Sequence, residues 1–169
     1  KFRNKIIHLV LDNFPDNFTR WQKQNYQRDY LFKGIELADK NDLIIFSDSD
    51  EIPNPNSIKN INVNKKFFLF IQKHYCYKFN ILNKTEEKWE GSRACKKKFL
   101  KDFNWLRTKV RKKNIRYPFW RIDKIKDIDV IENGGWHFSY FLNPEEIKNK
   151  IKSAPHEEFI NDDNLNIEE

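Results

Sequence analysis

The chain has 169 residues, of which 38% are hydrophobic, 15% aromatic and 34% charged, and its formal net charge is +7 at pH 7. This length predicts one domain with a hydrophobic core, and the apolar content excludes a disordered chain. The positive charge favours anionic partners such as nucleotides or phosphates, although a general richness in Lys, which here accompanies a richness in Asn, gives the same charge without any such role.

The first quarter of the sequence predicts a β-α-β unit. An apolar run over residues 5–11 predicts a buried strand, and residues 19–38 have a helical pattern in which Thr19 and Gln22 form a capping-box pair. A second apolar run, Leu43–Phe46, predicts a short strand covered on both faces. Such a unit is right-handed by default and brings two parallel strands into one sheet.

An acidic stretch, residues 47–51, follows the second strand directly, and Pro53 prevents the strand from continuing. Ligands of open α/β sheets bind at the carboxyl ends of strands, and carboxylates gathered there can hold a divalent cation. Asp48 and Asp50 are two residues apart and would share one face of a regular strand. A solvated acidic turn is the alternative, but the strand before the acids and the Glu-Ile-Pro sequence at the end favour a metal site.

The rest of the chain predicts short helices and further strands. Asn-Pro pairs at 54–55 and 143–144 are typical of helix starts. Helices are expected from these pairs to about residues 61 and 152, and from Asp102 to about 113; strands are expected over 67–71, 73–79, 89–95, 129–132 and 136–141. The sequence therefore predicts a single α/β domain, residues 1–169, with a mixed, mostly parallel sheet.

His137 follows Gly134 and Gly135 in an aromatic stretch. The two glycines permit a tight turn or a close approach of the backbone to a ligand. A neutral imidazole here would complete a metal-ligand set with Asp48 and Asp50. A core or edge histidine with ordinary hydrogen-bond partners is the alternative.

Lys150 and Lys152 precede a proline break and the sequence His156-Glu157-Glu158. This pattern suits anion contact and general-base chemistry. An ordinary capped helix start explains the same residues, and from the residues alone it is the favoured interpretation.

Cys76 and Cys95 form no Cys-x-x-Cys pair, so they do not predict a zinc site, and either a disulfide or two free thiols is compatible with the sequence. The sequence contains no apolar run as long as a transmembrane helix and no signal peptide.

Several of these stretches keep a fixed order: residues 48–53, 134–139, 150–153 and 156–159, with weaker similarity at 27–29 and at Trp89 with Gly91. Together they resemble glycosyltransferase family 17, the family of the bisecting N-acetylglucosaminyltransferase. The resemblance implies an inverting transferase with a Rossmann-like domain of the GT-A type. It would move a sugar, N-acetylglucosamine from UDP-N-acetylglucosamine, to a glycan hydroxyl.

The resemblance also implies roles for particular residues. They are Asp48, Asp50 and His137 for Mn²⁺ (or Mg²⁺), Arg28, Trp136 and Lys150 for the UDP-sugar donor, and Glu51 and Glu157 as candidate catalytic bases, between which the sequence does not choose. The cation would stabilise the charge that develops on the departing diphosphate. Trp89, Trp120 and Trp136 would suit stacking on sugars, although a core position is the better expectation for such residues.

The chain departs from the family in three places. Family members have an earlier strand and loop that help to hold the nucleotide base, and they continue after the His156 segment, so an incomplete domain with N-terminal strands missing is expected. Phe138 replaces the usual Cys after the histidine, which leaves the acceptor open. Membrane association is expected only through parts outside this sequence, with a cytoplasmic or membrane-associated location in a microbe and the Golgi lumen in a eukaryote.

Two other functions stay open. A metal-dependent nuclease or phosphodiesterase would use the same acids, histidine and basic surface. A non-catalytic module would bind glycan or nucleic acid through its basic and aromatic surface. The ordered motifs favour the transferase, whose partners would be a nucleotide-sugar donor and a glycan acceptor, with no specific nucleic acid.

Overall fold

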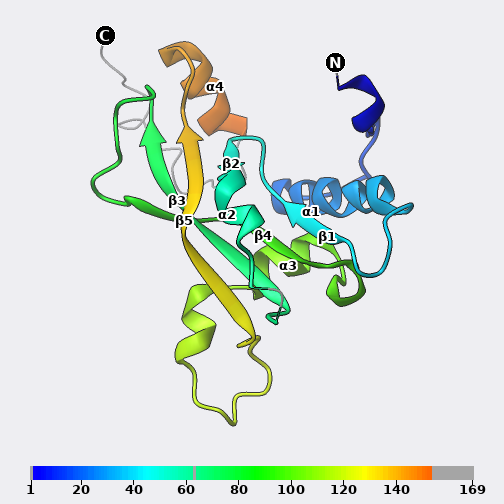
Figure 1. Ribbon diagram of the computed structural model, residues 1–169. Coiled ribbons are helices and arrows are strands. Elements are labelled where there is room, and N and C mark those ends of the chain that lie inside the picture. The colour runs from blue at the N-terminus through cyan, green and yellow to red at the C-terminus, as the bar shows by residue number, and fades with distance from the viewer. Residues whose placement is uncertain (1, 63, 154–169) are drawn as a thin grey trace.

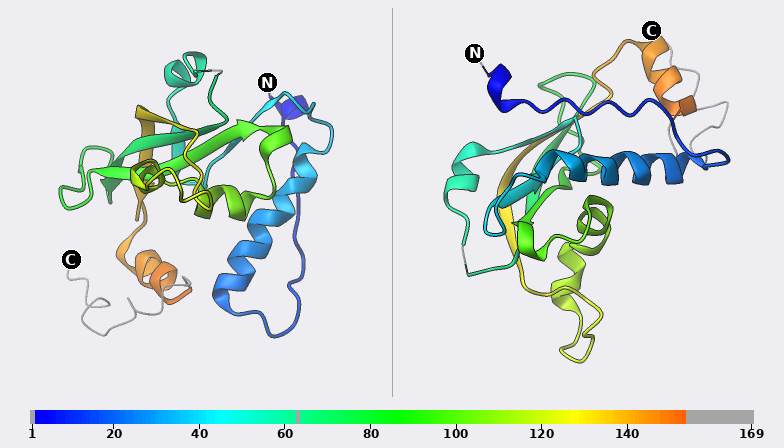
Figure 2. Two further views of the ribbon diagram at one scale, coloured as in Figure 1. Left: turned by 90° about the horizontal axis from the view of Figure 1, so that it is seen from below. Right: turned by 90° about the vertical axis from the view of Figure 1, so that its right-hand side faces the viewer.

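The computed structural model describes residues 2–62 and 64–153, and its centre is a mixed sheet with the strand order β1-β4-β3-β5-β2 (Figure 1). The strands are β1 (Leu43–Phe46), β2 (Glu51–Pro53), β3 (Phe67–Cys76), β4 (Lys88–Lys96) and β5 (Ile128–Ser139). The sheet curls, because the long strands β3 and β5 twist along their length (Figure 2). The prediction of an α/β domain with a mixed sheet is confirmed.

The helices begin where the sequence predicts them. They are α1 (Arg20–Tyr30), α2 (Pro55–Lys59), α3 (Phe103–Lys109) and α4 (Pro144–Ser153), with 3₁₀ turns at Arg3–Lys5, Leu31–Ile35, Lys97–Phe99 and Lys112–Arg116. The side chains of Thr19, Asn54 and Asp102 cap α1, α2 and α3 by accepting hydrogen bonds from backbone N–H groups. All helices in the described part of the chain are too short or too polar to cross a bilayer.

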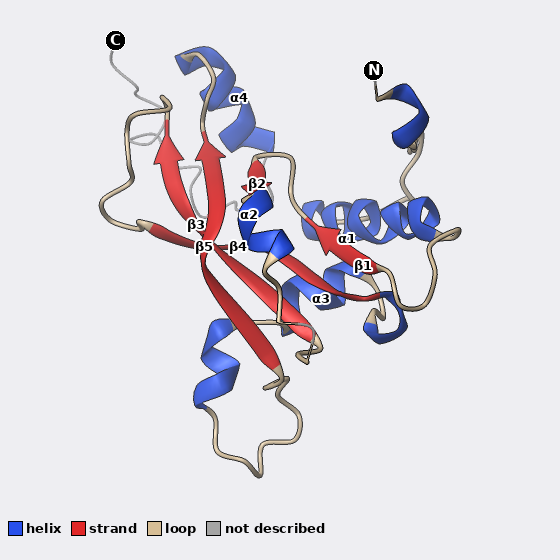
Figure 3. Cartoon of the chain, in the orientation of Figure 1, coloured by secondary structure: helices blue, strands red, loops and turns tan. Residues whose placement is uncertain are grey.

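Two sequence predictions about the sheet are wrong. Residues 5–11 form no strand: they run as an extended loop after the first 3₁₀ turn (Figure 3), with Ile6 and Ile7 more than half exposed. The sheet is also not mostly parallel, because β3 and β5 form its parallel pair, whereas β1–β4, β4–β3 and β5–β2 are antiparallel. The apolar run over residues 5–11 therefore indicated neither a strand nor burial, and the run of β1 indicated a strand but not its neighbour or direction.

The strand β3 supplies apolar side chains to both faces of the sheet. Phe67, Leu69 and Ile71 join a core on the face covered by α3 and the turn after α1 (Figure 2), whereas Phe68 and Phe70 join a smaller core under α2. This position explains the unbroken apolar run at the start of β3, since both faces of a central strand are covered. The predicted strands 67–71 and 73–79 form one element, as do 129–132 and 136–141.

Gly134 and Gly135 lie inside β5, where its pairing with β3 shifts register. A Cβ atom at Gly134 would lie 2.6 Å from the Ile71 nitrogen, and one at Gly135 would lie 2.1 Å from the Ile52 oxygen. Gly135 also has φ +126°, a backbone conformation that residues with a side chain rarely adopt. The two glycines thus allow β5 to pass closely between β3 and β2.

Beyond this irregularity the register brings polar residues together. Glu51 of β2 lies opposite His137 of β5, and His74 of β3 lies beside His137 on the other side. The glycine pair therefore sets the position of the candidate site.

Candidate active site

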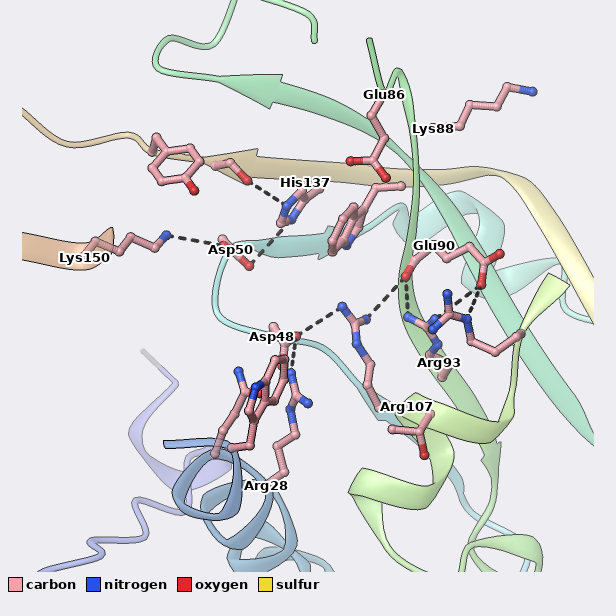
Figure 4. A pocket seen from close by; sticks show the side chains of 17 residues that line it. Arg28, Asp48, Asp50, Glu86, Lys88, Glu90, Arg93, Arg107, His137 and Lys150 are labelled. Carbon is pink, nitrogen blue, oxygen red and sulfur yellow. Dashed lines mark hydrogen bonds and ion pairs between the residues drawn. The ribbon is translucent and has the colours of Figure 1, made fainter. Parts of the chain in front are cut away.

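A pocket of about 760 Å³ opens near the end of β1, and residues of α1, α3, β4 and the end of β5 line it (Figure 4). Its lining is strongly charged, with more cationic than anionic side chains. The cations are Arg28, Lys88, Arg93, Arg107, Arg111 and Lys150, and the anions are Asp48, Asp50, Glu86 and Glu90. Such a lining suits a ligand that carries several negative charges.

Asp48 lies in the tight turn after β1, which the Glu51 N–H closes by donating to the Asp48 carbonyl at 3.0 Å. Its carboxylate faces two guanidinium groups (Figure 4). Arg28 Nη2 of α1 is 3.1 Å from Asp48 Oδ2, and Arg107 Nη2 of α3 is 3.2 Å from the same oxygen. Two helices thus bring cations to the first acid of the predicted metal motif.

Glu51 lies beneath the pocket, and its side chain has no exposed area. Its Oε1 accepts from Arg107 Nη1 at 2.8 Å and from Trp89 Nε1 at 2.9 Å, while Oε2 accepts from Ser92 Oγ at 3.4 Å. Burial raises the pKa of the Glu51 carboxyl, although the Arg107 charge and the Trp89 hydrogen bond act in the opposite direction. Glu51 is therefore a buried hydrogen-bond acceptor for the residues around it, and it does not line the pocket.

The imidazole of His137 is packed between other rings. It stacks almost parallel on Trp89, with ring centroids 4.5 Å apart, and its centroid is 4.7 Å from that of His74. Ser139 Oγ lies between the two histidines, 2.8 Å from His137 Nε2 and 3.1 Å from His74 Nε2. The stack and the serine together fix the plane and the direction of the His137 ring.

The other ring nitrogen of His137 faces Asp50 (Figure 4). Nδ1 is 3.6 Å from Asp50 Oδ1, and it is buried with no hydrogen-bond partner among the described residues. Burial lowers the pKa of His137 to about 4, against the raising effect of Asp50. The imidazole is therefore neutral at neutral pH.

Asp50 also lies near a cation. Lys150 Nζ of α4 is 3.9 Å from Asp50 Oδ2, and it lies 5.3 Å from the ring centroid of Tyr140 (Figure 4). Asp50 is thus between an imidazole and an ammonium group.

The pair formed by Asp50 and His137 fits a divalent cation, because a neutral imidazole with an open nitrogen and a carboxylate are both ligands for such ions. In residues 2–62 and 64–153, no three His, Cys, Asp or Glu side chains gather as a metal-binding group. Asp48 is turned to its two arginines. The predicted trio therefore appears as one close pair and one acid held by cations.

The predicted residues that remain are Trp136, Glu157 and His156, together with the two cysteines. Trp136 pairs across the sheet with Ile52, is 37% exposed and does not line the pocket. Glu157 and His156 lie outside the described residues. Cys76 and Cys95 are both free thiols.

Several residues in and around the pocket had no clear signal in the sequence. Arg107 stands in an ordinary amphipathic helix, and Ser92 and His74 stand in strands where any polar residue would have been unremarkable. Only the pairing of distant strands brings His74 beside His137 and Ser92 beside Glu51. The available signals were the motif 134–139, which contains Ser139, and the weak similarity at Trp89, whose indole stacks on His137.

Comparisons with known proteins identify no significant relative of this chain. No family model matches the sequence, and neither a curated protein nor a solved structure matches it significantly.

Proposed function

We propose that this chain binds a nucleoside diphosphate-sugar together with a divalent cation and acts as a glycosyltransferase of the GT-A type, as in family 17. The single observation that carries the proposal is the Asp50–His137 pair in a charged pocket whose lining has more cations than anions. Both residues belong to motifs on which the family resemblance rests.

The cationic lining supports binding of a diphosphate. Arg28 and Lys150 reach the pocket from two different helices, α1 and α4. Guanidinium groups bind phosphate oxygens in a bidentate manner, and an ammonium group binds them as a point charge. We assign the diphosphate to the space between these two residues.

One face of α1 supports binding of the nucleobase. Trp21, Gln24 and Arg28 follow one another at helical spacing, and all three line the pocket. Gln24 Oε1 is buried and accepts no hydrogen bond from the described residues. Uracil offers a ring N–H donor for such an acceptor and a flat face for the indole, so we assign the base to Trp21 and Gln24.

Asp50, His137 and Asp48 are the residues proposed to hold the cation. When bound, a divalent ion there stabilises the negative charge that develops on the departing diphosphate. The chain itself contributes to the same stabilisation through Arg28, Arg107 and Lys150.

Transfer with inversion also needs a base for the acceptor hydroxyl. Glu51 is buried outside the pocket lining, and its carboxylate already accepts hydrogen bonds from Arg107, Trp89 and Ser92. We therefore propose a positioning role for it. It orients Arg107 and Trp89, the groups that contact Asp48 and His137. Glu157 stays a candidate base.

The test is calorimetric titration of the chain with UDP, with and without MnCl₂. We expect UDP to bind, Mn²⁺ to tighten the binding, and Asp50→Asn to abolish the effect of Mn²⁺. Asp123→Asn is the matched control, because Asp123 pairs with Arg121 and does not line the pocket. No UDP binding to the folded wild-type chain, or an unchanged Mn²⁺ effect in Asp50→Asn, would contradict the proposal. Cleavage of a phosphodiester that requires Asp48 would favour the nuclease instead.

A further inference from the structure

Five aromatic residues lie at and just after the ends of β3 and β5, and their rings form two contacting groups, one of tyrosines and one of phenylalanines. We call them together the aromatic platform: Tyr77, Phe79, Phe138, Tyr140 and Phe141. Tyr77 and Tyr140 stack with centroids 6.1 Å apart, and Phe79 contacts Phe141 at 4.6 Å and Phe138 at 5.3 Å. Tyr77 is 57% and Phe79 75% exposed, so much of the platform faces solvent.

The two tyrosines have an unusual backbone conformation. Tyr77 has φ +66° and Tyr140 has φ +57°, in the left-handed region that bulky side chains rarely adopt. They lie side by side, since the Tyr77 N–H donates to the carbonyl of Ser139 at 3.0 Å. Strained backbone of this kind persists where the surrounding structure enforces it, and it gathers at ligand sites. Here it sets the direction of a stacked pair of rings.

The platform is continuous with the pocket. Tyr140 belongs to the pocket lining, and Lys150 Nζ lies 5.3 Å from its ring centroid and 3.9 Å from Asp50 Oδ2. One lysine thus links the inner end of the platform to the proposed cation site. Tyr77, stacked on Tyr140, continues the surface outward.

We propose that the aromatic platform binds the acceptor glycan, with Tyr77 and Tyr140 packing against the C–H face of an uncharged sugar ring. This inference rests on the proposed function of the pocket. The platform has no charged member, whereas the pocket beside it is lined with charged side chains, so the two surfaces suit the two substrates of a sugar transfer. Aromatic rings with phenol groups offer an apolar face and a polar edge, as a sugar ring does.

The sugar bound here would lie on the Lys150 side of Asp50. Its hydroxyl groups would find the Tyr140 phenol and the Lys150 ammonium group as partners. A nucleobase would fit the rings as well, but α1 already offers an indole and an open acceptor for that group on the other side of the pocket.

The test is saturation-transfer NMR of the full chain with chitobiose, mannobiose and lactose, in the presence of UDP and MnCl₂. Tyr77→Asn removes the ring and keeps a residue type that tolerates positive φ. We expect it to weaken binding of the best disaccharide about tenfold, as expected for one lost ring contact. Tyr77→Phe should retain wild-type binding within about twofold. Trp120→Ala is the control, because Trp120 is 64% exposed and stands outside both the pocket and the platform.

The outcomes separate this inference from the proposed function, because UDP affinity is measured on the same variants and should not change. UDP binding without any disaccharide binding, or equal disaccharide binding by Tyr77→Asn, overturns the platform and leaves the donor site standing. Disaccharide binding that needs Tyr77 but occurs in a chain that binds no UDP supports the platform and overturns the transferase. Binding to phosphatidylcholine vesicles in place of disaccharides overturns the platform as a glycan site.

Discussion

Arg107 joins Asp48 and Glu51 through one guanidinium group. Its Nη2 lies 3.2 Å from Asp48 Oδ2, and its Nη1 lies 2.8 Å from Glu51 Oε1. The same Nη1 donates to the carbonyl of Gly91 at 2.8 Å. A residue of α3 therefore ties the acidic turn after β1 to strand β4.

Loss of this guanidinium should destabilise the fold. Arg107→Met leaves the carboxylate of Glu51 buried without its cation, and breaking a buried pair on one side costs about 3–5 kcal/mol. Urea denaturation at neutral pH measures the change. The double variant Arg107→Met/Glu51→Gln should recover part of the loss, because the buried charge is then removed as well.

Arg121→Ala is the matched control for this prediction. Arg121 pairs with the exposed Asp123, and an exposed pair contributes little to stability because solvent screens its charges. If Arg107→Met is no more harmful than Arg121→Ala, the bridge does not stabilise the fold.

The folded state should lose stability in mild acid because of His137. Its folded pKa is lowered to about 4 from an unfolded value of 6.5, so the unfolded chain binds more protons between these values. Stability from this group is therefore fully present above pH 6.5 and is lost as the pH falls toward 4. The loss is on the order of 3 kcal/mol.

Denaturation of metal-free wild type and His137→Gln across this pH window measures the effect. The slope of stability against pH should be smaller in the variant. Equal slopes would mean that His137 is as easily protonated in the folded chain as in the unfolded one.

Ser139 should act as a positioning residue for His137. Its hydroxyl lies 2.8 Å from Nε2, and removal of a partner that orients a metal-binding histidine lowers metal affinity about 10- to 100-fold. We expect Ser139→Ala to weaken the Mn²⁺ effect on UDP binding within this range and to leave UDP binding without metal unchanged. Calorimetry distinguishes the two, and Ser57→Ala, which alters a serine outside the pocket, should change neither. An unaltered Mn²⁺ effect in Ser139→Ala would mean that the ring keeps its direction without the serine.

The glycine pair of β5 should tolerate no side chain. A Cβ atom at either position meets backbone atoms at less than 3 Å, and Gly135 also has φ +126°. We expect Gly134→Ala and Gly135→Ala to reduce the free energy of unfolding by more than about 2 kcal/mol. Gly34→Ala is the control, since its Cβ would make an ordinary contact at 3.4 Å with Leu9. Similar stability of all three variants would show that β5 can shift away from its neighbours.

Local features of the fold were predictable from the sequence, whereas long-range pairing was not. Helix starts such as Asn54-Pro55 depend on groups within a few residues, and the structure bears them out. The partner of β1 is β4, some fifty residues later and antiparallel, and no local pattern encodes that choice. The rule on carboxyl ends of parallel strands pointed to Asp48 and Asp50, which do line a pocket, although β1 pairs with β4 in the antiparallel direction.

In the candidate site, too, the sequence motifs predicted some features, whereas others depend on distant elements. The order of the motifs pointed to Asp50 and His137 together, and their side chains lie 3.6 Å apart. Glu51 belonged to the same acidic stretch, but its burial depends on Trp89 and Arg107, which come from other elements. A sequence pattern indicates which acids are gathered, but the surrounding elements decide which of them are exposed.

The two arginines on Asp48 have a consequence for the order in which ligands bind. A bare phosphate that enters the pocket competes with Asp48 for Arg28 and Arg107, and it leaves that carboxylate without a counter-charge. A phosphate that binds together with a divalent cation leaves Asp48 with a counter-charge, because the cation replaces the two arginines beside that carboxylate. Nucleotide and metal should therefore bind cooperatively, each raising the affinity of the other by the same factor.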